Sequence, residues 1–428
     1  MSAAASGVDV AIVGLGVVSA YGCSVRRFYE GLKAAEPVVR AIEVPGDPQR
    51  RSVCWSTVTG FAPPAWMDAR ILDGVDVIAQ WAAAATEQAL AQAAVTVDPL
   101  RTAVVHGTSM CGVQSLMRAQ HALDTAGFEA VPRKVMLRAL SNMAAGQLAM
   151  HYGWHGPSLT LSTACASTLD ALGHGAMMIR AGRADVVVAA GTEGGHSLES
   201  GGADTTFTPA LFYAPVLMGM LTADSDASRA CMPFDVERRG IASSEGSAAF
   251  VLERGDRARA RGARIFGYLR GYGSVADAHH PAAPDPSGEW EALAMRIALD
   301  DAAVAAGEVD ALFAHATGTP KGDTAEIRAI NSAYAGRARP LAVTSIKGHF
   351  GHAAAASGGM SLLAGLLGMA EGTIVNTAST TRPDPEALFD IVLGRPRSLA
   401  FDTFQVNAFG FGGQNSSIVV SRDPGRRG

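Results

Sequence analysis

The chain has 428 residues, of which 48% are hydrophobic and 18% are charged, so it can bury a large core. Its formal net charge of −5 gives no basic surface of the kind that nucleic-acid-binding proteins carry, and no nucleic acid partner is expected. The five cysteines are an odd number without a C-x-x-C pair, which argues against a disulfide framework or a metal site and favours a reducing, cytoplasmic compartment.

The first predicted strand, Val10–Val13, leads into a segment that begins like a dinucleotide-binding fingerprint. Gly14 and Gly16 match the first two glycines of the G-x-G-x-x-G pattern, but Ser19 stands at the third. That third glycine permits close packing of the following helix over a bound pyrophosphate. Its absence argues against a nicotinamide or flavin site, and no cofactor is expected.

Strand-like apolar runs alternate with alanine- and leucine-rich helical runs along the chain. This alternation predicts an α/β fold, and the almost wholly apolar run Asp185–Ala190 indicates sheets that are covered on both faces. The predicted strands are Val10–Val13, Ala103–His106, Leu159–Ser162, Asp185–Ala190, Ala248–Glu253, Ile265–Arg270, Ala311–Ala314, Leu341–Thr344, Phe404–Asn407 and Ser417–Val420. The predicted helices are Val77–Ala93, Leu169–Ala181, Glu289–Ala306, Ala325–Ala335 and Gly359–Met369.

These elements are expected to form two similar α/β halves, residues 1–254 and 265–428, that make a single integrated unit. The arginine-rich run between them, residues 255–264, is typical of a solvated surface segment. Residues 353–370 are uncharged but rich in Ala, Gly and Ser, which indicates a buried helix. No membrane span is therefore expected.

The predicted strand Leu159–Ser162 runs directly into a lone cysteine, Cys165, which precedes a helical pattern. The unpaired N–H groups of a helix N-terminus favour a thiolate over a thiol, so this cysteine is a candidate nucleophile with a lowered pKa. Free cysteine is also a common core residue. The chemical interpretation therefore depends on other segments of the chain.

Three later segments each combine a predicted strand or turn with chemically active residues. In the first, His315 follows a strand and opens a Gly/Thr loop, and Glu326 lies on the helix after it. In the second, Lys347 and His352 precede a run of small residues. In the third, a strand ends in the glycine-dense loop Asn407–Asn415. Taken singly, each segment could be purely structural.

Together, the segments S-T-A-C-A-S, H-x-T-G-T-P, K-x-x-x-G-H and N-x-F-G-F-G-G-x-N resemble the β-ketoacyl synthases, specifically the type II acyl-carrier-protein group. The resemblance extends from Val10 to about Val420 and includes supporting signatures at Pro233–Asp235, Glu245-Gly246 and Asp277–His280. It implies a thiolase-like fold, in which two similar α/β halves form a layered α-β-α-β-α core.

The resemblance also implies catalytic roles. Cys165 would receive an acyl group from a thioester, and neutral His315 and His352 would donate N–H bonds to the enolate formed by decarboxylation of a malonyl thioester. Lys347 would pair with Glu326 as an orienting element rather than as an acid or base. The expected function is therefore decarboxylative condensation in type II fatty acid or polyketide biosynthesis.

Further roles follow from the same resemblance. The backbone N–H groups of Cys165 and Phe411 would form an oxyanion hole, and Phe411 would act as a gate on a loop made mobile by glycines. Those glycines are Gly410, Gly412 and Gly413. The residues expected to contact the substrate and its phosphopantetheine arm are Thr317, Thr319, His280 and Met110. Self-capping of the loop is an alternative role for the two threonines.

Several positions depart from the family pattern and put the choice of substrate in doubt more than the type of reaction. They are Ala316 and Thr168, each where a glycine is usual, Gln414, Arg239, and Ala282, which lacks a hydroxyl that relatives often present.

An acyl carrier protein is the expected partner, together with a second ketosynthase-like chain in a homodimer or heterodimer that pairs strands such as Leu159–Ser162. Arg133, Lys134 and Arg138 are candidates for docking the acidic carrier. Two alternatives remain at this stage: a tunnel-shaping, non-elongating partner subunit, and a cysteine acyltransferase or hydrolase. Such subunits lack the cysteine, and a hydrolase has no need of two enolate-stabilising histidines.

Overall fold

The computed structural model describes residues 7–194, 210–222 and 226–424. Their main sheet has eleven strands in the order β12-β10-β9-β14-β15-β8-β1-β7-β6-β4-β5. These strands are β1 (Val10–Val18), β4 (Thr102–Gly107), β5 (Ser158–Leu161), β6 (Val186–Glu193), β7 (Gly246–Arg254), β8 (Gly267–Ala276), β9 (Ala311–Phe313), β10 (Ala342–Thr344), β12 (Asp390–Ile391), β14 (Thr403–Gly410) and β15 (Gln414–Ser421). Two small sheets pair β2 (Arg40–Glu43) with β3 (Ser52–Trp55) and β11 (Thr373–Ile374) with β13 (Arg397–Ser398).

The α-helices of the described residues lie mainly between the strands in chain order. They are α1 (Val25–Ala34), α2 (Ala69–Leu72), α3 (Val77–Ala93), α4 (Val113–Ala126), α5 (Val135–Ala139), α6 (Met143–Tyr152), α7 (Ser167–Arg180), α8 (Ala210–Leu217), α9 (Gly255–Ala260), α10 (Glu289–Ala302), α11 (Pro320–Ala333), α12 (Lys347–Phe350) and α13 (Ser357–Glu371). Two short 3₁₀ turns, η3 (Ala164–Ala166) and η6 (Ala354–Ala356), directly precede α7 and α13.

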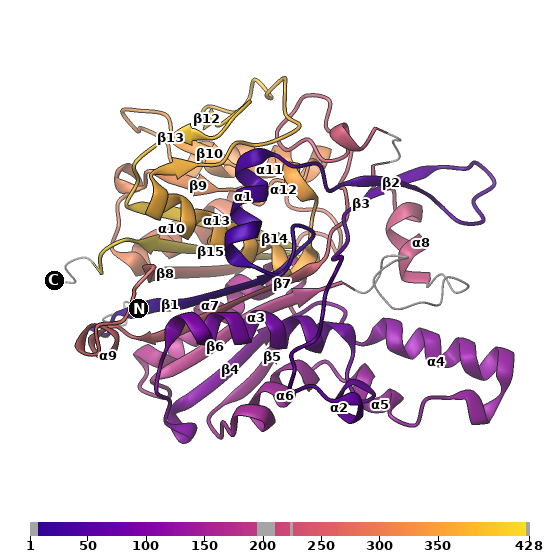
Figure 1. The fold of residues 1–428 in the computed structure, drawn as a ribbon. Helices are drawn as coiled ribbons and strands as arrows, with labels where there is room; N and C mark the ends of the chain where they lie inside the picture. The colour runs from indigo at the N-terminus through magenta and orange to yellow at the C-terminus, as the bar shows by residue number, and fades with distance from the viewer. Residues whose placement is uncertain (1–6, 195–209, 223–225, 425–428) are drawn as a thin grey trace.

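The two halves of the main sheet have the same topology. In the order β5-β4-β6-β7-β1, strands β5, β4 and β6 are parallel to one another, β7 is antiparallel to β6, and β1 is antiparallel to β7. In β10-β9-β14-β15-β8, the same pattern recurs. The halves meet where Ala11 and Ile12 of β1 pair with Tyr268 and Gly267 of β8 (Figure 1). The predicted pair of similar α/β halves is confirmed.

Helices form three layers around the two halves of the sheet. In the first half, α3 packs on β1 and β7 and α6 packs on β4. In the second half, α10 packs on β8 and β15 and contacts α11. Between the halves, α7 contacts β4 and β6, α13 contacts β14 and β7, and the two helices touch each other. This is the α-β-α-β-α order that the resemblance implied.

The glycines that begin like a dinucleotide fingerprint serve strand–helix packing instead. A Cβ atom at Gly14 would lie 2.1 Å from the carbonyl oxygen of Ala89, and one at Gly16 would lie 1.8 Å from that of Ala85. Both glycines therefore let β1 approach the backbone of α3 closely. The strand continues to Val18, five residues beyond its predicted end.

The predicted seam at residues 255–264 falls on α9 and the turn after it. The run at residues 353–370 forms η6 and the buried helix α13, as expected, and none of the helices in the described ranges is long and apolar enough to cross a membrane. Helix α4 was not predicted. Only Gln114 and Ala119 are buried on it, so its sequence lacks a core-facing apolar stripe.

Candidate active site

Cys165 lies on a tight elbow between β5 and α7. Ala164, just before it, has a φ of 49°, a left-handed conformation that is costly for alanine. The elbow is held by Ser167, whose hydroxyl donates to the Ala164 carbonyl at 2.7 Å and accepts the Thr163 N–H at 3.0 Å. The Thr163 hydroxyl also donates to the buried carboxylate of Asp170. The nucleophile is thus fixed from several sides.

A second elbow faces the first across the middle layer. It joins α12 to α13 through η6, and Ala354 on it has a φ of 40°, matching Ala164. Thr168, which stands where the family usually has glycine, connects the two elbows, because its hydroxyl donates to the carbonyl of Ala355. This second elbow carries His352, whose Nε2 lies 3.1 Å from Sγ of Cys165.

His315, two residues after the end of β9, joins Cys165 and His352 in a group of three side chains. Its ring centroid lies 5.3 Å from that of His352, with the ring planes at 85°. Glu326 on α11 holds the His315 segment, because its carboxylate accepts the backbone N–H groups of His315 at 2.8 Å and Ala316 at 2.5 Å. The same carboxylate accepts a bond from the side-chain amide of Asn407 at 3.1 Å. Asn407 lies in the N-x-F-G-F-G-G-x-N segment, and this contact is a role that the motif alone does not indicate.

Both histidines are neutral in this environment. Burial, then the charge of Lys347, lowers the pKa of His352 to about 3. Burial likewise holds the pKa of His315 well below 6.5, with Lys347 and His352 acting in the same direction. A neutral imidazole carries one N–H and can donate it to a developing oxyanion. The predicted charge state of the pair is confirmed.

The predicted lowering of the Cys165 pKa is wrong. Burial raises the pKa of this thiol to about 11. The charge of Lys347 and the backbone N–H groups of Phe411 and Cys165 oppose this rise without cancelling it. Desolvation of a thiolate in a largely apolar site therefore outweighs the polarised N–H groups of the short helical turn. The thiol therefore has to give up its proton as it reacts with a thioester.

Lys347 and Glu326 interact at longer range than a direct ion pair. Both are buried, and each shifts the pKa of the other, but no ion pair within 4 Å joins them among the described residues. Burial lowers the pKa of Lys347 and raises that of Glu326 to about 7. The expected pair is thus an electrostatic coupling, and the direct contacts of Glu326 are with the His315 segment.

Phe411 lies at the tip of the hairpin between β14 and β15 and is 43% exposed. A Cβ atom at Gly410 would lie 2.6 Å from the carbonyl oxygen of Thr163, so glycine lets the hairpin touch the Cys165 elbow. Gly412 and Gly413 have φ values of 84° and 77°, which suit a short hairpin turn. The Gly412 N–H is also bonded to the Pro281 carbonyl at 2.8 Å, so the mobility of this loop stays a prediction.

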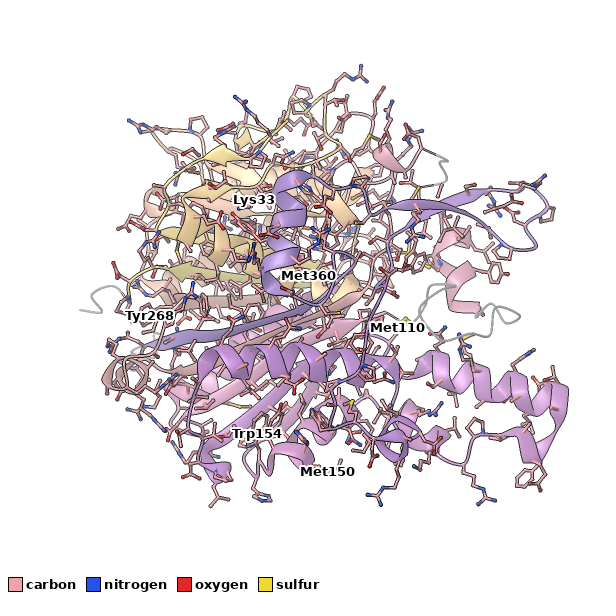
Figure 2. The ribbon with its side chains drawn as sticks, in the orientation of Figure 1. Lys33, Met110, Met150, Trp154, Tyr268 and Met360 are labelled. Carbon is pink, nitrogen blue, oxygen red and sulfur yellow. The ribbon has the colours of Figure 1, made fainter. Side chains whose placement is uncertain are left out.

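The remaining predicted residues lie around this group at various depths. Thr317 is buried, and its hydroxyl lies 3.1 Å from that of Thr319, the self-capping arrangement that was the alternative. His280 is exposed next to Pro281, beside the hairpin tip. Met110 is 39% exposed at the N-terminal end of α4 (Figure 2). Contacts of these residues with a substrate stay predictions.

Two other sequence expectations are refined by the structure. Of the two histidines in the K-x-x-x-G-H segment, His349 points elsewhere, because its Nε2 bonds to the Asn376 carbonyl at 2.7 Å. Among the docking candidates, Lys134 and Arg138 both pair with Asp73, at 3.2 and 3.4 Å. Their charge is partly neutralised within the chain, which weakens them as a carrier-binding pair.

Comparisons with known proteins agree with this geometry. Residues 8–258 match the family model described as "Beta-ketoacyl synthase, N-terminal domain", and residues 266–381 match the corresponding "C-terminal domain". A relative from Coxiella burnetii, 3-oxoacyl-[acyl-carrier-protein] synthase 2, is 32% identical over 421 residues, which cover 96% of this chain and 98% of the relative. A protein of the same name from Synechocystis sp. is 30% identical over 418 residues, with coverages of 96% and 98%.

Solved structures give the same result for the fold. The ishigamide ketosynthase/chain length factor superposes with a TM-score of 0.87 at 28% identity, covering 97% of this chain and 99% of that one. A type II polyketide ketosynthase in complex with its acyl carrier protein superposes with a TM-score of 0.86 at 26% identity, with the same coverages. With both family models matched and the Cys165, His315 and His352 side chains gathered in one site, the chain belongs to the β-ketoacyl synthase family.

Proposed function

We propose that this chain is a β-ketoacyl-acyl-carrier-protein synthase that works in type II fatty acid or polyketide biosynthesis. The observation that carries the proposal is the 3.1 Å contact between Sγ of Cys165 and Nε2 of His352, with the ring of His315 5.3 Å from that of His352. A thiol nucleophile facing two neutral N–H donors suits acyl transfer followed by condensation through an enolate.

In the first half-reaction, Cys165 attacks the carbonyl of an acyl thioester carried by phosphopantetheine. The new bond joins Sγ to the acyl carbon, and the bond between that carbon and the pantetheine sulfur breaks. The proton of the Cys165 thiol passes to the departing pantetheine thiolate, which leaves as a thiol. The N–H groups of Cys165 and Phe411, which lower the pKa of the thiol, would stabilise the tetrahedral oxyanion.

In the second half-reaction, a malonyl thioester loses CO2, and the electron pair of the broken C–C bond forms an enolate. His315 and His352 donate N–H bonds to the enolate oxygen. The enolate carbon then attacks the acyl carbon on Cys165, a C–C bond forms, and the C–S bond breaks. The released thiolate takes up one proton. The products are a β-ketoacyl thioester on the carrier, CO2 and the free thiol.

The direct test mixes the protein with an acyl carrier thioester and a malonyl carrier thioester and determines the carrier products by mass spectrometry. We expect an acyl adduct on Cys165 and a β-ketoacyl product two carbons longer. Cys165→Ala should abolish both, whereas the exposed Cys23→Ala change should alter neither.

The outcome separates the proposal from its alternatives. Release of the free acid without a condensation product would assign the chain to the cysteine hydrolases. The absence of any acyl adduct would assign it to the tunnel-shaping partner subunits, although the presence of Cys165 argues against that reading. The proposed chemistry itself needs no cofactor beyond the phosphopantetheine arm.

An acyl carrier protein and a second ketosynthase-like chain are the proposed partners. β5 is an edge strand of the main sheet, and helix α4 projects from the body of the molecule (Figure 1). Apolar side chains are exposed on β5, on α4 and on α5. They include Leu116, Leu123, Met136 and Leu159. An edge strand with exposed apolar side chains near it is a ready surface for pairing with another chain. Five free cysteines support a reducing, cytoplasmic compartment.

A further inference from the structure

The second ring nitrogen of His352 has a specific partner. Its Nδ1 lies 2.8 Å from Oγ of Ser357, the first residue of α13, and both residues are buried, at 7% and 2% exposed. We propose that Ser357 is a positioning residue whose hydroxyl donates to Nδ1 and holds His352 in the tautomer that carries its proton on Nε2. This inference rests on the proposed function and deepens it.

The reason lies in the single proton of a neutral imidazole. If the proton sat on Nδ1, Ser357 would accept it, and Nε2 would present a lone pair to the enolate oxygen. If the proton sits on Nε2, Nδ1 becomes an acceptor that needs a donor, and a serine hydroxyl is one. Which tautomer a histidine adopts is set by the bond that its other nitrogen makes. By donating to Nδ1, Ser357 would support the tautomer in which His352 can stabilise an oxyanion.

The twin elbow shows that this contact is not a requirement of the local backbone. Ser167 occupies the same place at the start of α7 as Ser357 does at the start of α13, and each backbone N–H bonds to the residue three before it. The Ser167 hydroxyl bonds to its own elbow, at Thr163 N–H and the Ala164 carbonyl. The Ser357 hydroxyl bonds to the catalytic ring instead.

His315 provides a second contrast. In the described part of the chain, its Nδ1 is buried and has no hydrogen-bond partner. A side-chain hydroxyl therefore contacts Nδ1 in only one of the two rings, the one whose Nε2 touches the nucleophile. The proposal assigns the fixed tautomer to His352 alone.

The chain supplies a matched control on the same helix. Ser361 lies one turn after Ser357 on α13 and is 1% exposed, and its hydroxyl has no partner among the described residues. Ser361→Ala makes the same chemical change at the same depth without touching His352. Ser357→Thr keeps the hydroxyl and adds one methyl group.

The test compares Ser357→Ala, Ser357→Thr and Ser361→Ala in two assays. These are acyl adduct formation on Cys165 and release of CO2 from a malonyl carrier thioester. We expect Ser357→Ala to lower decarboxylation on the order of 10- to 100-fold, as loss of an orienting partner of a functional histidine does, with a smaller effect on adduct formation. Ser357→Thr should recover most of the rate, and Ser361→Ala should match the wild type.

A spectroscopic measurement reads the tautomer directly. Long-range ¹H–¹⁵N spectra of protein labelled at its 11 histidines, with His352 assigned by comparison with His352→Gln, should show the proton on Nε2. Ser357→Ala should weaken this preference. A proton on Nδ1 in the wild type, or decarboxylation by Ser357→Ala equal to that of Ser361→Ala, would overturn the inference. Failure of the wild type to form any β-ketoacyl product would instead overturn the proposed function, and the spectrum would still decide the tautomer.

Discussion

At the scale of single residues, burial is the main cause of the pKa shifts of the reacting side chains. The charge of Lys347 lowers the pKa of His315 and His352 further and also lowers that of the Cys165 thiol, although burial is the larger influence on all three. The site therefore rests with a protonated sulfur and neutral imidazoles. Nucleophile activation therefore requires loss of the thiol proton during acyl transfer rather than a standing thiolate.

The raised thiol pKa predicts how Cys165 reacts with an alkylating agent in the free enzyme. A pKa of about 11 leaves little thiolate at neutral pH, so its fraction rises roughly tenfold per pH unit from pH 7 to 9. The alkylation rate of the Cys165 peptide, followed by mass spectrometry, should rise with it and show no plateau in this range. Lys347→Met should slow the reaction at every pH, because it removes the charge that favours the thiolate.

The exposed Cys23 of the same sample serves as the internal reference for reagent reactivity. A plateau in the Cys165 rate below pH 8 would show a standing thiolate and contradict this account.

The two histidines should be separately essential for the enolate. Loss of one oxyanion donor typically lowers the rate about 100- to 1000-fold. His315→Ala should therefore lower formation of the β-ketoacyl product by that order, because the enolate oxygen loses one of two N–H bonds. His155→Ala, an exposed position, should have no effect. Product formation by His315→Ala within threefold of this control would remove His315 from the mechanism.

At the scale of elements, the site is made where three turns meet. Two elbows with left-handed alanines, Ala164 and Ala354, start the two central helices, and the hairpin between β14 and β15 closes over the first elbow. Strained residues of this kind persist only where the surrounding structure fixes them, and they cluster at functional sites. The packing of α7 against α13 therefore sets the distance between nucleophile and histidine.

The hairpin contact can be tested at its closest point. Gly410→Ala would place a Cβ atom 2.6 Å from the Thr163 carbonyl oxygen, so either the hairpin or the elbow must move. We expect slower acylation of Cys165, because the Phe411 N–H shifts away from the sulfur, and a lower melting temperature. Gly307→Ala is the control, since Gly307 has no neighbour within 4 Å of an added Cβ and does not have a positive φ. An unchanged acylation rate in Gly410→Ala would show that this contact is dispensable.

At the scale of the whole molecule, the repeated topology builds one site from both halves. Cys165 comes from the first half, and His315, His352 and the hairpin come from the second. Neither half alone would hold a nucleophile and its donors together. Among the strands of the described residues, β5 lies at one edge of the sheet and β12 at the other.

The proposed dimer should depend on the outward face of β5. The carbonyl groups of Pro157 and Leu161 accept hydrogen bonds from the backbone N–H groups of Val104 and Thr108, on the β4 side. Successive residues of a strand point their backbone N–H and C=O groups to opposite edges, so those of Thr160 face away from β4. Thr160→Pro removes an outward N–H without touching the ladder to β4, and it should convert a dimer to monomers in sedimentation experiments. Thr160→Val keeps the N–H and should remain dimeric. A dimeric Thr160→Pro protein would place the interface elsewhere.

The sequence by itself determined the alternation of strands and helices, the family and the candidate reacting residues, because apolar periodicity and short motifs are local properties of a chain. Residues 353–370 were correctly predicted to be a buried helix, and Cys165, His315 and His352 were correctly grouped. Helix α4 escaped prediction because its apolar side chains face away from the core.

Only the tertiary structure decided the electrostatics and the fine contacts. The thiol pKa rises because atoms from several segments shield the sulfur of Cys165 from water, which no local motif encodes, and Glu326 bonds to the His315 backbone rather than directly to Lys347. Likewise, the Ser357 hydroxyl meets His352 because of the way the second elbow turns. Desolvation and hydrogen-bond geometry depend on atoms brought together from distant parts of the chain, and only folding sets those distances.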